Sequence, residues 1–295
     1  MNPERQRLFK EAIDHIVTLQ ERERHGIGMQ KEKTLHAVVK HFEDADEDHQ
    51  EIPIEGYIAD IFTGERIIEI QNGNFNKLRG KLDAFLPFYP VTIVYPIPHR
   101  KWNIWIDPQT GELKKRNRCA REGSFYQAFR ELYRIRPYLT HPNLQIELLL
   151  IDMEEYRLQD GWSRDGKRGS HRYDRLPLAL FDERTLSCPQ DYRMFLPYEL
   201  PEPFTAAQLA RAAGFRDSFS GVLQLLTGLG VTVRVGKKGR AYLYRAAEDW
   251  EMDEAHELKA GVSAPETAES AHCWKNGEMP ASCEPDEAML WRPEE

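Results

Sequence analysis

Two acidic residues, Asp60 and Glu69, each lie inside a short apolar run. The runs span residues 57–62 and 66–71, and the turn residues at 63–65 between them predict two strands of a hairpin. Removing a carboxylate from water costs several kcal/mol unless it is paired or binds a cation. Two carboxylates that converge at a sheet edge therefore indicate a divalent-metal site. The alternative is that both face solvent on the polar side of a half-covered sheet.

The elements around the hairpin follow a definite order. We expect a helix, three strands, a second helix and a further strand, at residues 30–42, 51–54, 57–62, 66–71, 75–86 and 91–95. The first helix carries Glu32 in its first turn, and the second places Lys77 and Lys81 one turn apart on one flank. The last run, VTIVY, is continuous and apolar, which is typical of a central strand covered on both faces.

This order of elements and acids, over residues 30–107, resembles the PD-(D/E)XK nuclease superfamily, the fold of many restriction enzymes and junction resolvases. The resemblance implies an α/β fold, with a restriction-endonuclease-like mixed sheet flanked by helices. It places Glu32, Asp60 and Glu69 in the family's three acidic positions. It also implies that Mg²⁺ or Mn²⁺ is held by Asp60, Glu69 and the Ile70 carbonyl. Glu32 would hold a metal-bound water or a second ion. Such an ion neutralises phosphoryl charge and activates water.

The sequence departs from the family at Gln71, where a lysine is usual, and at Ala59, because no proline precedes Asp60. Gln71 can orient a water molecule but brings no charge to the transition state. Some members supply the lysine from the following helix. Lys77 or Lys81 would be the candidate here.

Net charge divides the chain. Residues 248–295 hold 14 Asp and Glu against three Lys and Arg, a net charge of −11, so the preceding residues carry +3 of the whole-chain −8. The acidic stretch has few aliphatic residues and no amphipathic period, which predicts a disordered acidic tail. The positive remainder is compatible with a nucleic-acid partner.

After a strand at 144–153, residues 157–199 read as a basic loop and linker. The loop combines glycines, aromatic residues and cations, of which we expect four to contact nucleic acid: Arg164, Lys167, Arg168 and Arg172. Glycines allow close approach of the backbone to a ligand, and cations bind phosphate. The alternative is a mobile surface loop without a ligand.

Residues 200–247 resemble a winged helix-turn-helix, because two capped helices precede a hairpin with a basic tip. The resemblance implies that Arg216 and Ser220 face the major groove. It also implies that Lys237, Lys238 and Arg240 of the wing contact the backbone or the minor groove. Winged helices also serve as protein-binding modules, so that interpretation stays open.

Two further predictions concern the N-terminus and the cellular compartment. Residues 1–29 should form an amphipathic helix that packs on the core or contacts a second copy of the chain in a homodimer. No apolar run approaches the ~20 residues of a membrane span, so we expect no membrane association and a cytoplasmic protein. The domains are then 1–29, the nuclease-like 30–156, the linker 157–199, the winged helix 200–247 and the tail 248–295.

The sequence favours a Mg²⁺-dependent DNA endonuclease whose N-terminal domain cuts and whose winged helix positions double-stranded DNA. Defence, repair and mobile-element processing are all compatible with such an enzyme. The alternative is a non-catalytic DNA-binding regulator on a nuclease fold that has lost activity. A third hypothesis is an RNA-processing enzyme.

Overall fold

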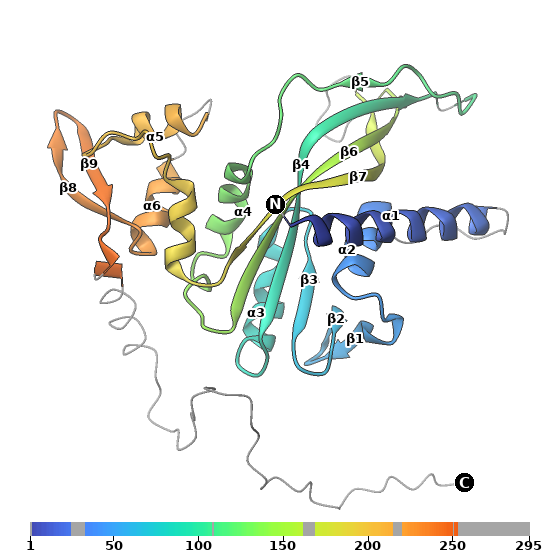
Figure 1. Cartoon of the computed structure of the whole chain (residues 1–295), viewed down its shortest axis with the longest axis horizontal. Coiled ribbons are helices and arrows are strands. Elements are labelled where there is room, and N and C mark those ends of the chain that lie inside the picture. The colour runs from blue at the N-terminus through green and yellow to red at the C-terminus, as the bar shows by residue number, and fades with distance from the viewer. Residues whose placement is uncertain are drawn as a thin grey trace, which may run out of the picture. The chain divides into compact units, whose positions relative to one another are not determined.

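The computed structural model describes residues 2–24, 33–107, 109–161, 169–214, 220–249 and 251–252. All of them belong to one compact unit, residues 1–257 (Figure 1). The predicted tail at 248–295 lies almost entirely outside the described residues. Met252, however, is described and fully buried. The folded part therefore continues past residue 247, where we expected the tail to begin.

A mixed sheet of seven strands forms the centre of the described structure. Six strands follow the order β1-β2-β3-β4-β6-β7, and β5 pairs with β4. The β3–β4 and β4–β6 pairs are parallel and the others are antiparallel. The strands are β1 (Gln50–Ile54), β2 (Tyr57–Phe62), β3 (Ile67–Ile70), β4 (Val91–Ile106), β5 (Asn117–Arg118), β6 (Leu144–Leu158) and β7 (His171–Leu186). The expected α/β fold with a mixed sheet is confirmed, and β1, which contains Pro53, is an edge strand.

Strand β4 is much longer than predicted. The sequence predicts a strand at 91–95, but the structure has one strand from Val91 to Ile106. β3 ends opposite Val94, so Pro96 and Pro98 have no β3 neighbour that requires their missing amide hydrogens. The long β4, β6 and β7 therefore extend beyond β3, as Figure 1 shows.

The predicted linker at 157–199 is wrong for most of its length. β7 occupies residues 171–186 and pairs with β6 along its whole length, and a short helix η4 (Pro189–Phe195) follows. β7 is an edge strand rich in charged residues, so its apolar alternation is too weak to predict a strand. Arg175, for example, lies directly opposite Glu155 of β6.

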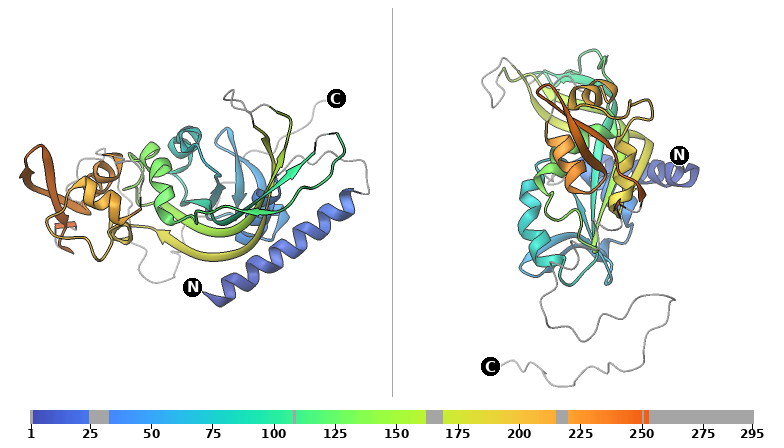
Figure 2. Two further views of the ribbon diagram at one scale, coloured as in Figure 1. Left: turned by 90° about the horizontal axis from the view of Figure 1, so that it is seen from above. Right: turned by 90° about the vertical axis from the view of Figure 1, so that its left-hand side faces the viewer.

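Helices cover both faces of the sheet. α1 (Pro3–Arg24) and α2 (Thr34–Glu43) pack on one face, and η2 (Phe75–Leu78), α3 (Arg79–Phe85), η3 (Phe125–Ala128) and α4 (Phe129–Arg134) pack on the other. Figure 2 shows α1 on one side of the curved strands and α3 and α4 on the other. A short η1 (Glu47–His49) leads into β1. The N-terminal helix packs on the core, which is one of its two expected roles, and it buries Phe9.

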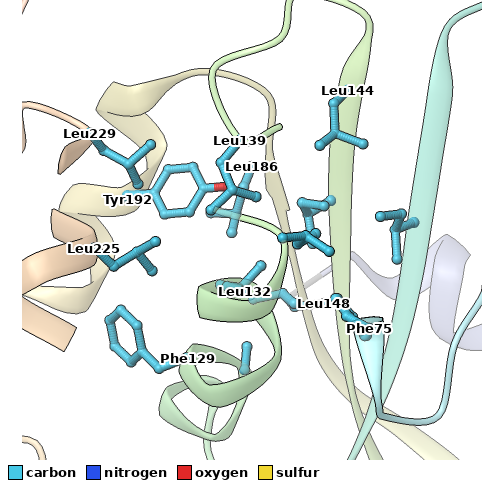
Figure 3. Close-up of a cluster of buried hydrophobic side chains, with 14 of the residues drawn as sticks. Phe75, Phe129, Leu132, Leu139, Leu144, Leu148, Leu186, Tyr192, Leu225 and Leu229 are labelled. Atoms are coloured by element: carbon cyan, nitrogen blue, oxygen red, sulfur yellow. The ribbon is translucent and has the colours of Figure 1, made fainter. Parts of the chain in front are cut away.

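The C-terminal segment shares its core with the sheet. α5 (Ala206–Ala212), α6 (Ser220–Gly228), β8 (Thr232–Lys238) and β9 (Ala241–Ala246) follow η4. Figure 3 shows Leu225 of α6, and Leu229 directly after this helix, beside Phe129 and Tyr192. We expected a separate domain at 200–247. Instead, one continuous apolar cluster contains residues of both the sheet and this segment. Among the described helices, none is both long and apolar enough to cross a membrane.

A buried ionic network ties α1 to the sheet. The Arg5 guanidinium binds Glu43 of α2 at 3.2 Å, Glu183 of β7 at 2.8 Å, and Glu147 of β6. It also lies 4.0 Å from the centre of the Phe42 ring. Burial, together with the charge of Glu147, raises the pKa of Glu43 to about 8. Three carboxylates therefore share the Arg5 cation, and Glu43 holds a proton near neutral pH.

The protonation of Glu43 should make folding stability fall with pH. Between about pH 4.5 and pH 8 the folded protein keeps a proton that the unfolded chain has lost, so the free energy of unfolding decreases across this window. Glu43→Gln cannot ionise and should flatten the decrease, giving a variant that is about 1 to 3 kcal/mol more stable than wild type at pH 8. Urea unfolding at several pH values measures this difference. Glu11→Gln, at an exposed site on α1, is the control and should follow the wild-type curve. Parallel curves for wild type and Glu43→Gln would contradict the assignment.

Candidate active site at the end of strand β3

Asp60 of β2 and Glu69 of β3 lie opposite each other, just beyond the point where the pairing of these two strands ends. β2 and β3 pair only at Ile61↔Ile68 and Phe62↔Ile67. The next position in this register brings Asp60 opposite Glu69. Beyond the last backbone pair, the Asp60 carboxylate accepts a hydrogen bond from the Ile70 amide at 2.7 Å, in place of a backbone carbonyl of β2. The carboxylates predicted from the hairpin are thus neighbours.

Glu69 is buried and paired with a lysine. Its side chain is 3% exposed, and the Lys81 ammonium binds its two oxygens at 2.9 and 2.7 Å. Burial and the negative charge of Asp60 raise the pKa of Glu69 to about 7, while Lys81 acts in the opposite direction. The carboxylate therefore gains or loses its proton near physiological pH, which is common among groups that function chemically.

A cavity of about 350 Å³ opens over the two carboxylates. Most residues predicted for the site lie around it, and the lining residues are His36, Asp60, Glu69, Ile70, Gln71, Asn72, Gly73, Lys77, Leu78 and Lys81. The Ile70 side chain is buried, like the other residues of β3. Of the two candidate lysines, Lys81 contacts Glu69, and Lys77 lines the wall.

His36 belongs to the site and was missed by the sequence reasoning. Its Nε2 lies 3.7 Å from Asp60 Oδ2, and it is in the first turn of α2. Its only signal in the sequence is a polar residue beside the apolar stripe of that helix. Glu32, the acid predicted for the same helix, lies outside the described residues.

The loop after β3 is held by its own turn and by α4. The Gln71 side-chain amide donates to the Gly73 carbonyl. Gly73 has φ of 135°, a conformation that a glycine adopts without strain. At the end of the loop the Phe75 amide donates to Glu131 of α4 at 2.9 Å, and Arg134 binds both oxygens of that carboxylate. Glu131 therefore positions the loop that carries Gln71.

The donor set at the cavity fits a divalent cation. Mg²⁺ is commonly held by one or two carboxylates while it keeps several waters. Asp60 and Glu69 supply two such carboxylates whose mutual repulsion raises the pKa of Glu69, and a cation would relieve that repulsion. Within the described ranges no group of three or more His, Cys, Asp or Glu side chains is arranged to hold a metal. Among the described residues, an ion here would rely on these two carboxylates.

The residues predicted to bind nucleic acid either do not line this cavity or lie outside the described ranges. Arg164, Lys167, Arg168 and Arg216 are not described, and nor is the side chain of Ser220 at the start of α6. Lys237, Lys238 and Arg240 are exposed at the tip of the β8–β9 hairpin. Arg172 of β7 lies 3.4 Å from Glu155.

Comparison with known proteins places the chain in a family. The model of a domain of unknown function, DUF8091, matches residues 33–187. An uncharacterized protein of Treponema pallidum (strain Nichols) is 27% identical over 217 residues, which cover 73% of this chain and 85% of the relative. No solved structure is significantly similar to the chain. The matched segment runs from α2 to the end of β7 and contains the whole carboxylate cavity. The chain therefore belongs to the DUF8091 family.

Proposed function

We propose that this protein is a metal-dependent endonuclease that hydrolyses phosphodiester bonds in nucleic acid, with double-stranded DNA as its substrate. The observation that carries the proposal is the pairing of Asp60 with a buried Glu69 whose pKa is raised to about 7, at the end of a central strand beside Lys81. A divalent cation bound there would supply charge neutralisation and an activated water.

The side chains around the cation would divide the remaining work. Asp60 and Glu69 would hold the ion. Lys81 would stabilise the charge that develops on the phosphoryl oxygens, in the role of the lysine that Gln71 replaces. His36, whose Nε2 lies 3.7 Å from Asp60 Oδ2, would orient that carboxylate. These roles need no residue outside the cavity.

The C-terminal segment supports the proposal that a winged helix holds the duplex. Phe204 and Tyr244 exchange both backbone hydrogen bonds, at 2.7 and 2.8 Å, so a third strand position joins the β8–β9 hairpin. The order is then helix, strand, two helices and hairpin, as in winged helices. The basic tip residues would contact phosphates. Gln224 of α6 accepts a hydrogen bond from the Tyr133 hydroxyl, so this side chain contacts α4.

A non-catalytic nucleic-acid-binding regulator is the second candidate. Two observations favour it: Lys81 already neutralises Glu69, and the Gln71 amide is used to hold its own turn. Both side chains would then have structural roles only.

Cleavage assays separate the two candidates. Supercoiled plasmid, linear duplex and RNA are each incubated with wild type in Mg²⁺, Mn²⁺ or EDTA. The endonuclease proposal predicts metal-dependent cleavage of the duplex, lost in EDTA and reduced at least a thousandfold in Asp60→Asn. Retention of nucleic-acid binding without any cleavage would establish the regulator instead. Cleavage of RNA alone would move the substrate to RNA.

A further inference from the structure

A second charged cluster lies where β4, β6 and β7 extend beyond β3. Its centre is Glu155 of β6, whose side chain is 2% exposed. Four cations surround it: Lys101 Nζ at 3.4 Å, Arg157 Nη1 at 2.5 Å, Arg172 Nε at 3.4 Å and Arg175 Nε at 3.6 Å. We call these five residues the Glu155 cluster. In the described part of the chain, Glu155 is the only carboxylate paired with any of the four.

Sheet register explains how the cluster forms. Glu155 lies directly opposite Arg175, and Arg157 lies opposite Arg172, in the antiparallel β6–β7 pair. Residues 155 and 157 point to the same face because side chains alternate along a strand. Cations from three strands are therefore fixed around one carboxylate by the backbone pairing of the sheet. The positions of these side chains therefore follow from the backbone and not from the mobility of the side chains.

The cluster has more positive charge than its own carboxylate requires. One buried carboxylate needs one cation, and three further cations at this distance repel one another. Arg175 shows this repulsion: its pKa is lowered by burial and by the positive charge of Arg172. Its Nε is buried and has no hydrogen-bond acceptor within the described structure. An anion bound at the cluster would supply both an acceptor and charge balance.

Solvent can reach the cations but not the carboxylate. The side chain of Arg172 is 50% exposed, and those of Lys101 and Arg157 are 28% and 27% exposed, against 2% for Glu155. A ligand that arrives from solvent therefore meets guanidinium and ammonium groups. Arginine guanidinium groups form two parallel hydrogen bonds with phosphate oxygens, which gives phosphate geometric selectivity over chloride.

The cluster adjoins the carboxylate cavity through α2. Tyr173 and Asp174 lie between two arginines of the cluster, and both contact the start of α2. The Asp174 carboxylate accepts the Thr34 amide at 3.2 Å and also binds the Thr34 hydroxyl. His36, in the same helical turn, lines the cavity next to Asp60. The cluster and the cavity are therefore connected by a continuous run of contacts through α2.

We infer that the Glu155 cluster is a phosphate-binding site that holds the backbone of a nucleic-acid strand beside the carboxylate cavity. The identity of the strand rests on the proposed function, because the cluster itself can recognise any phosphate ester. Glu155 has a positioning role: it holds the four cations together and does not contact the ligand.

Binding in EDTA tests the site without cleavage. Anisotropy of labelled single-stranded and duplex oligonucleotides is measured against salt for wild type, Arg172→Ala and Lys101→Ala. Each variant should bind about tenfold more weakly. Each should also flatten the salt dependence by about 0.9 per lost contact on duplex, or about 0.7 on a single strand. Arg184→Ala is the matched control, an arginine of β7 that is 46% exposed and paired with Asp182, and it should bind as wild type.

Thermal unfolding in inorganic phosphate, against chloride at equal ionic strength, distinguishes a free anion from a nucleic-acid strand. Phosphate that raises the midpoint in wild type but not in Arg172→Ala supports the site. If phosphate does so while neither oligonucleotide binds, the nucleic-acid ligand is overturned. Oligonucleotide affinities and salt slopes equal to wild type in both variants would overturn the site itself. These readouts do not depend on Asp60 or Glu69, so failure of the proposed function is seen separately, as intact cleavage by Asp60→Asn.

Discussion

Replacing Lys81 with methionine should slow cleavage by about a hundredfold to a thousandfold, the loss expected when one charged donor to a transition state is removed. The reason is geometric. Lys81 Nζ lies 2.7 Å from Glu69 and is the cation that can stand in for the lysine absent at Gln71. The same change at Lys77, which lines the cavity wall, should cost less than tenfold. Single-turnover cleavage of a duplex at saturating enzyme measures both rates.

The pH profile separates a catalytic Lys81 from a purely structural one. Lys81 lowers the pKa of Glu69, which burial and Asp60 raise to about 7. Its removal should therefore raise that pKa further and move the acidic limb of the rate profile to higher pH. Thermal unfolding confirms that the variant is folded. Equal rates for Lys81→Met and wild type, with an unshifted profile, would remove Lys81 from the mechanism.

Replacing Glu155 with glutamine should lower the free energy of unfolding by about 3 kcal/mol, because the change leaves four cations around an uncharged, buried centre. Glu154→Gln is the neighbouring control. Glu154 pairs with Arg116, which is 45% exposed, so its loss should cost at most about 1 kcal/mol. Urea unfolding measures both. Inorganic phosphate should recover part of the loss in Glu155→Gln, because it screens the unpaired cations. A cost equal to that of the control would mean that the cations do not depend on Glu155.

The hairpin and its acids could be predicted from sequence because the information is local. Asp60 and Glu69 follow from strand length and the turn between the strands, and hairpin register brings them together. Burial of Ile70 follows from the apolar run that forms β3. The helix with Lys81 follows from its apolar period. These inferences concern neighbours in the chain.

The features that the sequence did not predict depend on pairing between distant segments. The sequence predicts a linker where β7 lies, because β7 is rich in charged residues that pair with residues of β6 and has no clear apolar alternation. His36 reaches Asp60 only because α2 packs across the end of β3. The predicted boundary at residue 200 does not separate two cores, because the apolar residues of α6 pack on α4. Helical spacing shows which face of α6 is apolar but not which element packs against that face.

Calorimetric titration with Mn²⁺ tests most directly whether Asp60 and Glu69 hold a divalent cation. Wild type should bind Mn²⁺ more tightly at pH 8 than at pH 6, because the ion displaces the proton that Glu69 holds with a pKa of about 7. Asp60→Asn and Glu69→Gln should each abolish this binding, whereas Glu65→Gln, in the exposed turn of the same hairpin, should leave it unchanged. Equal Mn²⁺ affinity in wild type, Asp60→Asn and Glu69→Gln would contradict the account.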